Sequence, residues 1–74
     1  MQKLVKVQYI CKKLGINQKD LAGLIGCSES NFSSKVNGRT QTTLSEMQMI
    51  KEELNKLARK KNMKEYTLDE IFTD

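Results

Sequence analysis

Several residue types that carry chemistry are scarce or missing in this chain of 74 residues. It has no histidine, and its two cysteines, Cys11 and Cys27, are far apart in the sequence. Because structural zinc sites need four ligands at short paired spacings, the sequence predicts no metal site and no cofactor, and we expect reduced thiols rather than a disulfide. It also lacks a glycine-rich phosphate loop and recognisable paired carboxylates, which argues against an enzyme and against a small-molecule ligand.

Proline is absent and aromatic residues are few, whereas Leu, Lys, Glu, Gln and Met are abundant. This composition favours helix almost everywhere and predicts an all-α fold. The length allows a single small core, so we expect one domain over residues 1–74, a compact bundle of about five short helices. No apolar run approaches the ~20 residues that cross a bilayer, and the start does not read as a signal peptide. We therefore expect a cytoplasmic protein that does not bind membranes.

The charge balance favours a polyanionic partner. Thirteen basic residues stand against nine acidic ones, for a net charge of +4. This excess is modest, and nucleic acid is the partner class that it fits best.

Residues 17–38 carry the most informative pattern. Asn17 suits the position before a helix, where its side chain can accept a backbone N–H, and Gly26 suits the position just after one. Between them, Leu21 and Ile25 lie four apart and share one face, while the small Ala22 lets a second helix approach closely. The sequence predicts a short helix that ends in a sharp turn.

A second short helix follows the turn. Ser28 is a candidate cap, Phe32 and Val36 form its inward face, and Gly38 supplies the stop. Two short helices joined by a tight turn that contains glycine form a helix-turn-helix. The outer face of the second helix is short and polar, which suits close approach to base edges. Its residues are Glu29, Ser30, Asn31, Ser33, Ser34 and Asn37.

This stretch resembles the motif of the phage repressor and Cro-type family of helix-turn-helix regulators, with the lambda repressor-like DNA-binding fold. The residues that carry the resemblance are Gln18, Leu21, Ala22, Ile25, Gly26, Ser28, Phe32, Ser33, Asn37 and Gly38. One position departs from the pattern: Lys35 stands where many members have an apolar residue that anchors the second helix, so anchoring falls on Val36.

The resemblance implies a sequence-specific transcriptional regulator, either a phage or mobile-element repressor or a Cro-like protein. Such a protein is expected to insert the helix Ser28–Asn37 into the major groove of double-stranded operator DNA. It is expected to bind this DNA as a homodimer. The residues expected to read bases are Glu29, Ser30, Ser33 and Ser34. The residues expected to contact phosphates are Gln18, Asn31, Lys35, Asn37, Gly38, Arg39 and Thr40. The alternative is a protein-interaction module with the same fold, such as an antirepressor or an antitoxin-like partner, which the acidic Glu29 and the modest charge favour.

The flanking segments complete the bundle. Apolar residues at helical spacing predict a first helix over residues 3–14, with Gly15 as its stop. A Thr-x-x-Glu cap at Thr43 begins a long helix of about 16 to 18 residues, whose expected apolar stripe is Leu44, Met47, Ile50, Leu54, Leu57 and Ala58. This helix ends in the basic run 59–62, which we interpret first as cations that stabilise the negative helix end and, as the alternative, as a second nucleic-acid patch. The same cap at Thr67 begins a last short helix, whose apolar face either closes the core of the same chain or packs on a second copy.

Overall fold

The computed structural model describes residues 4–72, and this range contains five α-helices and no strand. The helices are α1 (Val5–Leu14), α2 (Gln18–Leu24), α3 (Glu29–Val36), α4 (Leu44–Lys60) and α5 (Leu68–Phe72). The predicted all-α bundle of about five helices is therefore confirmed.

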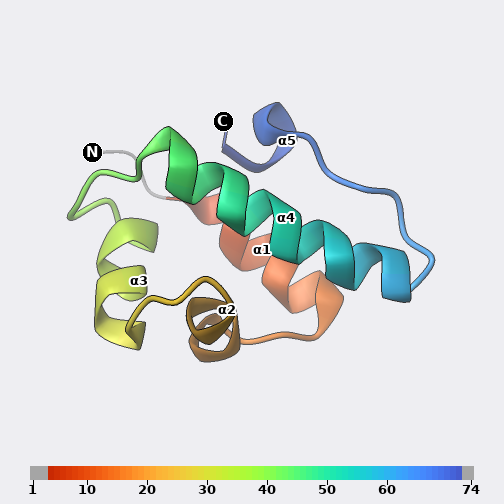
Figure 1. Ribbon diagram of the computed structural model, residues 1–74, viewed down its shortest axis with the longest axis horizontal. Helices are drawn as coiled ribbons and strands as arrows, with labels where there is room; N and C mark the ends of the chain where they lie inside the picture. Colours follow the sequence, from red (N-terminus) through yellow and green to blue (C-terminus); the bar gives the residue numbers. More distant parts are fainter. Residues whose placement is uncertain (1–3, 73–74) are drawn as a thin grey trace.

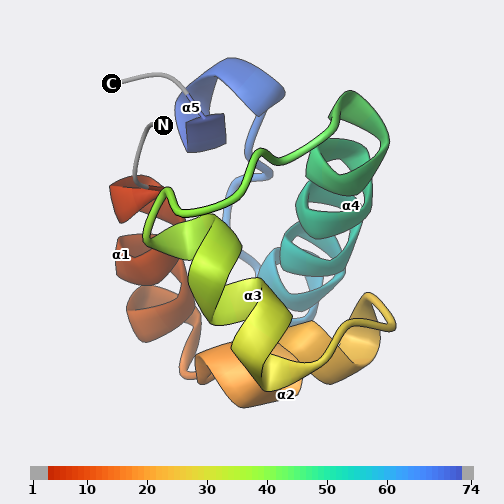
Figure 2. The same ribbon diagram turned by 90° about the vertical axis from the view of Figure 1, so that its left-hand side faces the viewer.

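The helices surround one core. In Figure 2, α1 and α4 stand on opposite sides, α2 lies below, α5 above, and α3 crosses in front. α1 packs against α3, α4 and α5, and α2 packs against α3 and α4. The buried apolar side chains are Leu4, Val7, Ile10, Cys11, Leu14, Leu21, Ala22, Phe32, Val36, Ile50, Leu54, Ala58 and Ile71.

The first helix is shorter than predicted at its start. It begins at Val5, and Leu4 precedes it in a non-helical conformation. Leu4 is nevertheless buried, and its N–H donates to the carbonyl of Val36 at 2.8 Å, which ties the start of the described chain to the end of α3. Lys3, also expected in this helix, lies outside the described residues. The stop is as predicted, with Gly15 at a φ of 74° that only glycine adopts without strain.

The long helix α4 begins as its sequence predicts. The Thr43 hydroxyl accepts from the N–H of Glu46 at 3.2 Å, and the Glu46 carboxylate accepts from the N–H of Thr43 at 3.0 Å. The expected apolar stripe is wrong at Leu44, which is 62% exposed. Leu44 lies six residues before Ile50, and at about 100° per residue this rotates it by about 120° away from that buried side chain.

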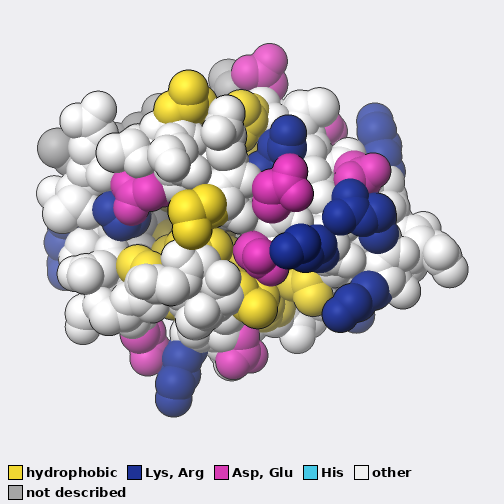
Figure 3. All heavy atoms as spheres, in the orientation of Figure 1, with side chains coloured by type: hydrophobic (Ala, Val, Ile, Leu, Met, Phe, Trp, Pro, Cys, Tyr) yellow, Lys and Arg dark blue, Asp and Glu magenta, His cyan; other side chains and the backbone are white. Residues whose placement is uncertain are grey.

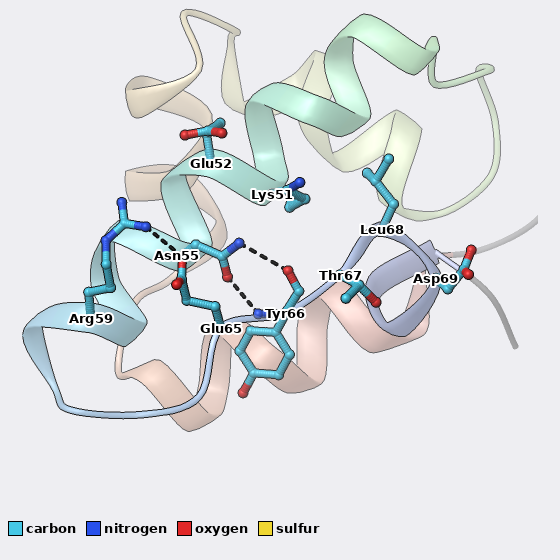
Figure 4. Close-up of a pocket in the computed structure, with 9 residues that line it drawn as sticks. All are labelled: Lys51, Glu52, Asn55, Arg59, Glu65, Tyr66, Thr67, Leu68 and Asp69. Atoms are coloured by element: carbon cyan, nitrogen blue, oxygen red, sulfur yellow. Dashed lines mark hydrogen bonds and ion pairs between the residues drawn. The ribbon is translucent and has the colours of Figure 1, made fainter.

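The C-terminal segment belongs to the core of the same chain. α5 packs against α1 and α4, and Ile71 is only 1% exposed. The extended residues before α5 are held by Asn55 of α4 (Figure 4). Its side-chain oxygen accepts from the N–H of Tyr66 at 2.7 Å, and its amide donates to the carbonyl of Tyr66 at 3.0 Å. Of the two alternatives for this segment, the structure supports the one in which it closes the core.

Candidate nucleic-acid interface

The helix α2 is built as its sequence predicts. The Asn17 side-chain oxygen accepts from the N–H of Asp20 at 2.8 Å, which satisfies one of the free donors at the start of the helix. Leu21 and Ala22 are both buried, at 0% and 1% exposure. The small Ala22 lies in the core between α2 and its neighbours, so α3 can pack closely against α2.

A tight turn then redirects the chain. Gly26 has a φ of 73°, and the N–H of Cys27 donates back to the carbonyl of Ala22 at 2.9 Å. These two features close α2 in the way that a left-handed glycine closes a helix. The Ser28 hydroxyl accepts from the N–H of Asn31 at 3.2 Å and starts α3 only a few residues later. The predicted helix-turn-helix is therefore present, with its caps at the predicted residues.

The helix α3 is anchored by two fully buried side chains. Phe32 and Val36 lie four residues apart on its inner face and are both 0% exposed. Because these anchors face inward, the opposite side of α3 lies at the surface, where Figure 2 shows the helix across the front of the molecule.

The polar side of α3 is most open in its first turn. Glu29, Ser30 and Asn31 are exposed, whereas Ser33 and Ser34 are half-buried. Apart from Glu29 this part of the helix is uncharged, and none of its exposed side chains is apolar. Figure 3 shows the same character on a larger scale: the surface over α3, at the left, is mostly uncharged and polar. The arrangement offers small hydrogen-bonding groups at the tip of a surface helix.

The end of α3 is closed by bonds within the chain. The Asn37 amide donates to the carbonyl of Ser33 at 2.9 Å and to its hydroxyl at 3.2 Å. The N–H of Gly38 donates to the carbonyl of Lys35, and the N–H groups of Arg39 and Thr40 donate to that of Ser34. These backbone donors are engaged, so in this loop the exposed side chains of Arg39 and Thr40 are the groups that extend outward.

Lys35 has a partner that the sequence pattern did not reveal. Its ammonium nitrogen lies 2.8 Å from a carboxylate oxygen of Glu46, and its side chain is only 16% exposed. The hydrogen bond from Lys35, and after it that from the Thr43 N–H, lowers the pKa of the Glu46 carboxyl below its ordinary value. At the position where the resemblance expects an apolar anchor, a lysine stem and an ion pair join α3 to the start of α4.

The remaining predicted phosphate contact, Gln18, is the first residue of α2 and is half-buried. Gln18, Asn31 and the loop residues are distributed around the helix-turn-helix rather than gathered in one pocket. The basic run at residues 59–62, by contrast, is at the opposite end of the molecule from α3 (Figure 1), and Arg59 there pairs with Glu65. Basic and acidic side chains alternate over that end of α4 (Figure 3), so the structure does not add this run to the α3 surface.

The cysteines are separate thiols, as expected. Cys11 is buried, which raises the pKa of its thiol to about 11, and Cys27 is half-buried in the turn. Within residues 4–72, no group of three or more Cys, Asp or Glu side chains could hold a metal ion. The helices of this range also include none that is both long and apolar enough to cross a membrane.

Comparison with known families agrees with this geometry. Residues 6–56 match the family model of the Cro/C1-type HTH DNA-binding domain, and the matched range contains α2, the turn and α3. The chain therefore belongs to the Cro/C1-type helix-turn-helix DNA-binding family. Neither the curated proteins nor the solved structures that were searched include a match to it.

Proposed function

We propose that this protein is a sequence-specific transcriptional regulator that binds double-stranded operator DNA by inserting α3 into the major groove. The observation that carries this proposal is the exposed polar first turn of α3, on a helix held in place by Phe32 and Val36. Recognition helices of this class contact base edges mainly through their N-terminal residues.

Base reading is assigned to Glu29, Ser30, Ser33 and Ser34. The hydroxyl groups can donate or accept at base edges, and the Glu29 carboxylate can accept from the amino group of cytosine. Glu29 also repels phosphates, so it discourages sites where no cytosine is within reach. Ser30 is exposed, whereas Ser33 and Ser34 are half-buried, which makes Ser30 the first choice for a test.

Contacts to the DNA backbone are assigned to residues around α3, and they supply affinity without reading sequence. Arg39 and Thr40 reach phosphates through their exposed side chains, since their N–H groups are bonded to Ser34. Gln18 and Asn31 contribute side-chain amides. Lys35, Asn37 and Gly38 are also assigned to phosphates, and within the chain the Lys35 ammonium pairs with Glu46 and the Asn37 amide donates to the Ser33 carbonyl.

The proposed mechanism is steric. Residues 1–74 act as one DNA-binding domain in the cytoplasm, a homodimer occupies a two-fold symmetric operator, and the bound protein blocks polymerase. Single small modules bind one half-site only weakly, which is the physical reason to expect a dimer on DNA. The host process is that of a phage or mobile element, in keeping with the Cro/C1-type family.

Selection of bound duplexes from a random pool tests this proposal. We expect enrichment of palindromic sites whose half-sites are about one helical turn apart. With the selected site, Ser30→Ala should change the preferred base at one or two positions. Arg39→Ala should weaken binding to every sequence and reduce the salt slope by about one unit.

Two results would contradict it. Equal, sequence-independent losses from both variants would remove the division between base reading and backbone contact. The absence of binding to any duplex, even at low salt, would favour the protein-interaction module, for which the acidic Glu29 at the tip of α3 is the supporting observation.

A further inference from the structure

A hollow of about 440 Å³ lies beside the start of α2, and Gln18 connects it to the surface assigned so far. One wall is a single face of α1, formed by Val5, Gln8, Tyr9 and Lys12, which recur at steps of three and four. The other wall is the connection to α2, including Asn17 and Gln18. The hollow thus joins Gln18 to a helix that has no role in the proposed function.

The charge of this hollow suits an anion. Among residues 4–72, it is lined by the cation Lys12 and by no carboxylate. Cys11 also lines it, but burial raises the pKa of that thiol to about 11, so the thiol is neutral near pH 7. Three other surface hollows all include acidic residues: Glu52, Glu65 and Asp69 in one, Glu52 and Glu53 in another, and Glu53 in the third.

The hollow also exposes apolar surface. Tyr9 is 64% exposed and Val5 is 59% exposed, although both lie on a helix whose opposite face is fully buried. A nucleotide backbone presents a charged phosphate beside an apolar deoxyribose. An ammonium group next to a tyrosine ring matches both parts of that ligand.

Its position is next to the proposed DNA surface. α1 packs against α3, and Figure 2 shows α1 along one side of α3, with the start of α2 below them. Because Gln18 lines the hollow, DNA whose groove holds α3 and whose backbone reaches Gln18 would also lie beside this hollow.

We propose that this hollow is a further contact site for the DNA backbone, in which Lys12 binds a phosphate and Tyr9 packs against the adjoining deoxyribose. The inference rests on the proposed function, and it extends the DNA-binding surface from the helix-turn-helix to α1. The proposal gives two neighbouring lysines different roles, because Lys12 lines the hollow, whereas Lys13 does not.

The test uses the full chain, the duplex selected above, and the variants Lys12→Gln and Lys13→Gln. Both lysines are exposed in the last turn of α1, so the two variants remove the same charge from the same region. We expect Lys12→Gln to reduce the salt slope by about 0.9, so that raising salt from 50 to 200 mM weakens its binding roughly 3-fold less than that of the wild type. Lys13→Gln should leave the slope unchanged, and neither variant should change the preferred bases.

Tyr9→Ala tests the apolar part separately. It should weaken binding to all sequences several-fold while keeping the salt slope, because no charge is removed. Equal slopes for Lys12→Gln and Lys13→Gln, with wild-type binding intact, would overturn this inference and leave the proposed function standing. A wild-type protein that binds no duplex would overturn both. Circular dichroism melting of each variant checks that a loss of binding is not a loss of folding.

Discussion

The ammonium group of Lys35 lies 2.8 Å from the carboxylate of Glu46, and this ion pair joins the end of α3 to the capping box of α4. Glu46 therefore has two bonding partners, since the same carboxylate also accepts from the N–H of Thr43 at 3.0 Å. The orientation of α3 is thus linked to the start of α4, the longest helix of the bundle.

The first prediction follows from the lowered pKa of Glu46. A carboxyl whose pKa is lower in the folded than in the unfolded state stabilises the fold above its unfolded pKa and loses this effect as pH falls through the folded value. Wild type should therefore be more stable than Glu46→Gln at pH 7. The difference should shrink as the pH drops below the ordinary value of 4.5. Urea unfolding between pH 7 and pH 3 measures it.

Lys35→Met is the control for this experiment, because it keeps much of the aliphatic stem and removes the first cause of the pKa shift. In that background, Glu46→Gln should produce a smaller pH-dependent difference. Because Glu70 also has a lowered pKa, the stability of every variant will fall in acid, and only the difference between variants reports on Glu46. A difference that does not change with pH would contradict the role assigned to the pair.

The second prediction compares two glycines at the end of α2. Gly23 is exposed and helical, and a Cβ there meets nothing within 4 Å, so Gly23→Ala should stabilise by about 0.5–1 kcal/mol. Gly26 has equally open space but a φ of 73°, so Gly26→Ala should destabilise by about 1–2 kcal/mol. Denaturant titration of the two variants should give opposite signs, and shifts of the same sign would be inconsistent with the turn geometry.

The third prediction concerns Ala22, which is 1% exposed in the core at the motif. Ala22→Leu should cost about 1–3 kcal/mol through overpacking and should abolish DNA binding, because the larger side chain pushes α2 and α3 apart. Thermal melting and DNA titration measure the two effects on one sample. Lys19→Leu adds the same side chain at an exposed position of α2 and should melt near the wild-type temperature. Normal melting and binding by Ala22→Leu would refute the helix pairing.

The fourth prediction concerns the bonds between Asn55 and Tyr66. Asn55→Ala removes the partner of both backbone groups, and leaving partly buried groups unpaired should cost about 1–3 kcal/mol. Hydrogen exchange at the Tyr66 amide should become faster than in wild type. The exposed neighbour Lys56 provides a control, since Lys56→Ala removes only a surface ion pair with Glu53. Unchanged exchange at Tyr66 in Asn55→Ala would contradict this assignment.

Truncation after Asn62 extends the same test to the whole segment. It removes Ile71, which is 1% exposed against α1 and α4. The shortened protein should lose helix content and stability at every concentration, because the apolar faces of both helices become exposed. A truncated chain that stays fully folded but loses a concentration-dependent dimer would assign the segment to dimerisation instead.

The helix ends were predictable because each depends on residues close in sequence. Asn17, Ser28 and Thr43 bond to backbone groups three residues ahead, and such caps can be recognised in the sequence alone. The same holds for the stop at Gly26 and for the inward pair Phe32 and Val36, which together define the helix-turn-helix.

The interactions that sequence reasoning missed join residues far apart in the chain. Lys35 and Glu46 are on different helices, and Asn55 meets Tyr66 across a turn. Two signals in the sequence could have pointed to these interactions. Asn55 is a polar residue beside Leu54 of the apolar stripe, and Lys35 is a lysine at a position where an apolar anchor is expected. Leu44 was misplaced because steps of three and four accumulate rotation along a long helix. The assignments to bases and phosphates stay predictions until a complex with DNA is measured.

The packing of α5 against α1 has a consequence for the order of folding. Residues 17–38 contain the caps and the turn that define the helix-turn-helix, yet the core beneath α1 and α4 is complete only when Ile71 reaches it. On a ribosome, therefore, the helix-turn-helix emerges well before the chain can bury the face that supports it. Stable folding waits for the contact between α1 and α5, and this loop closure rather than helix formation should limit its rate.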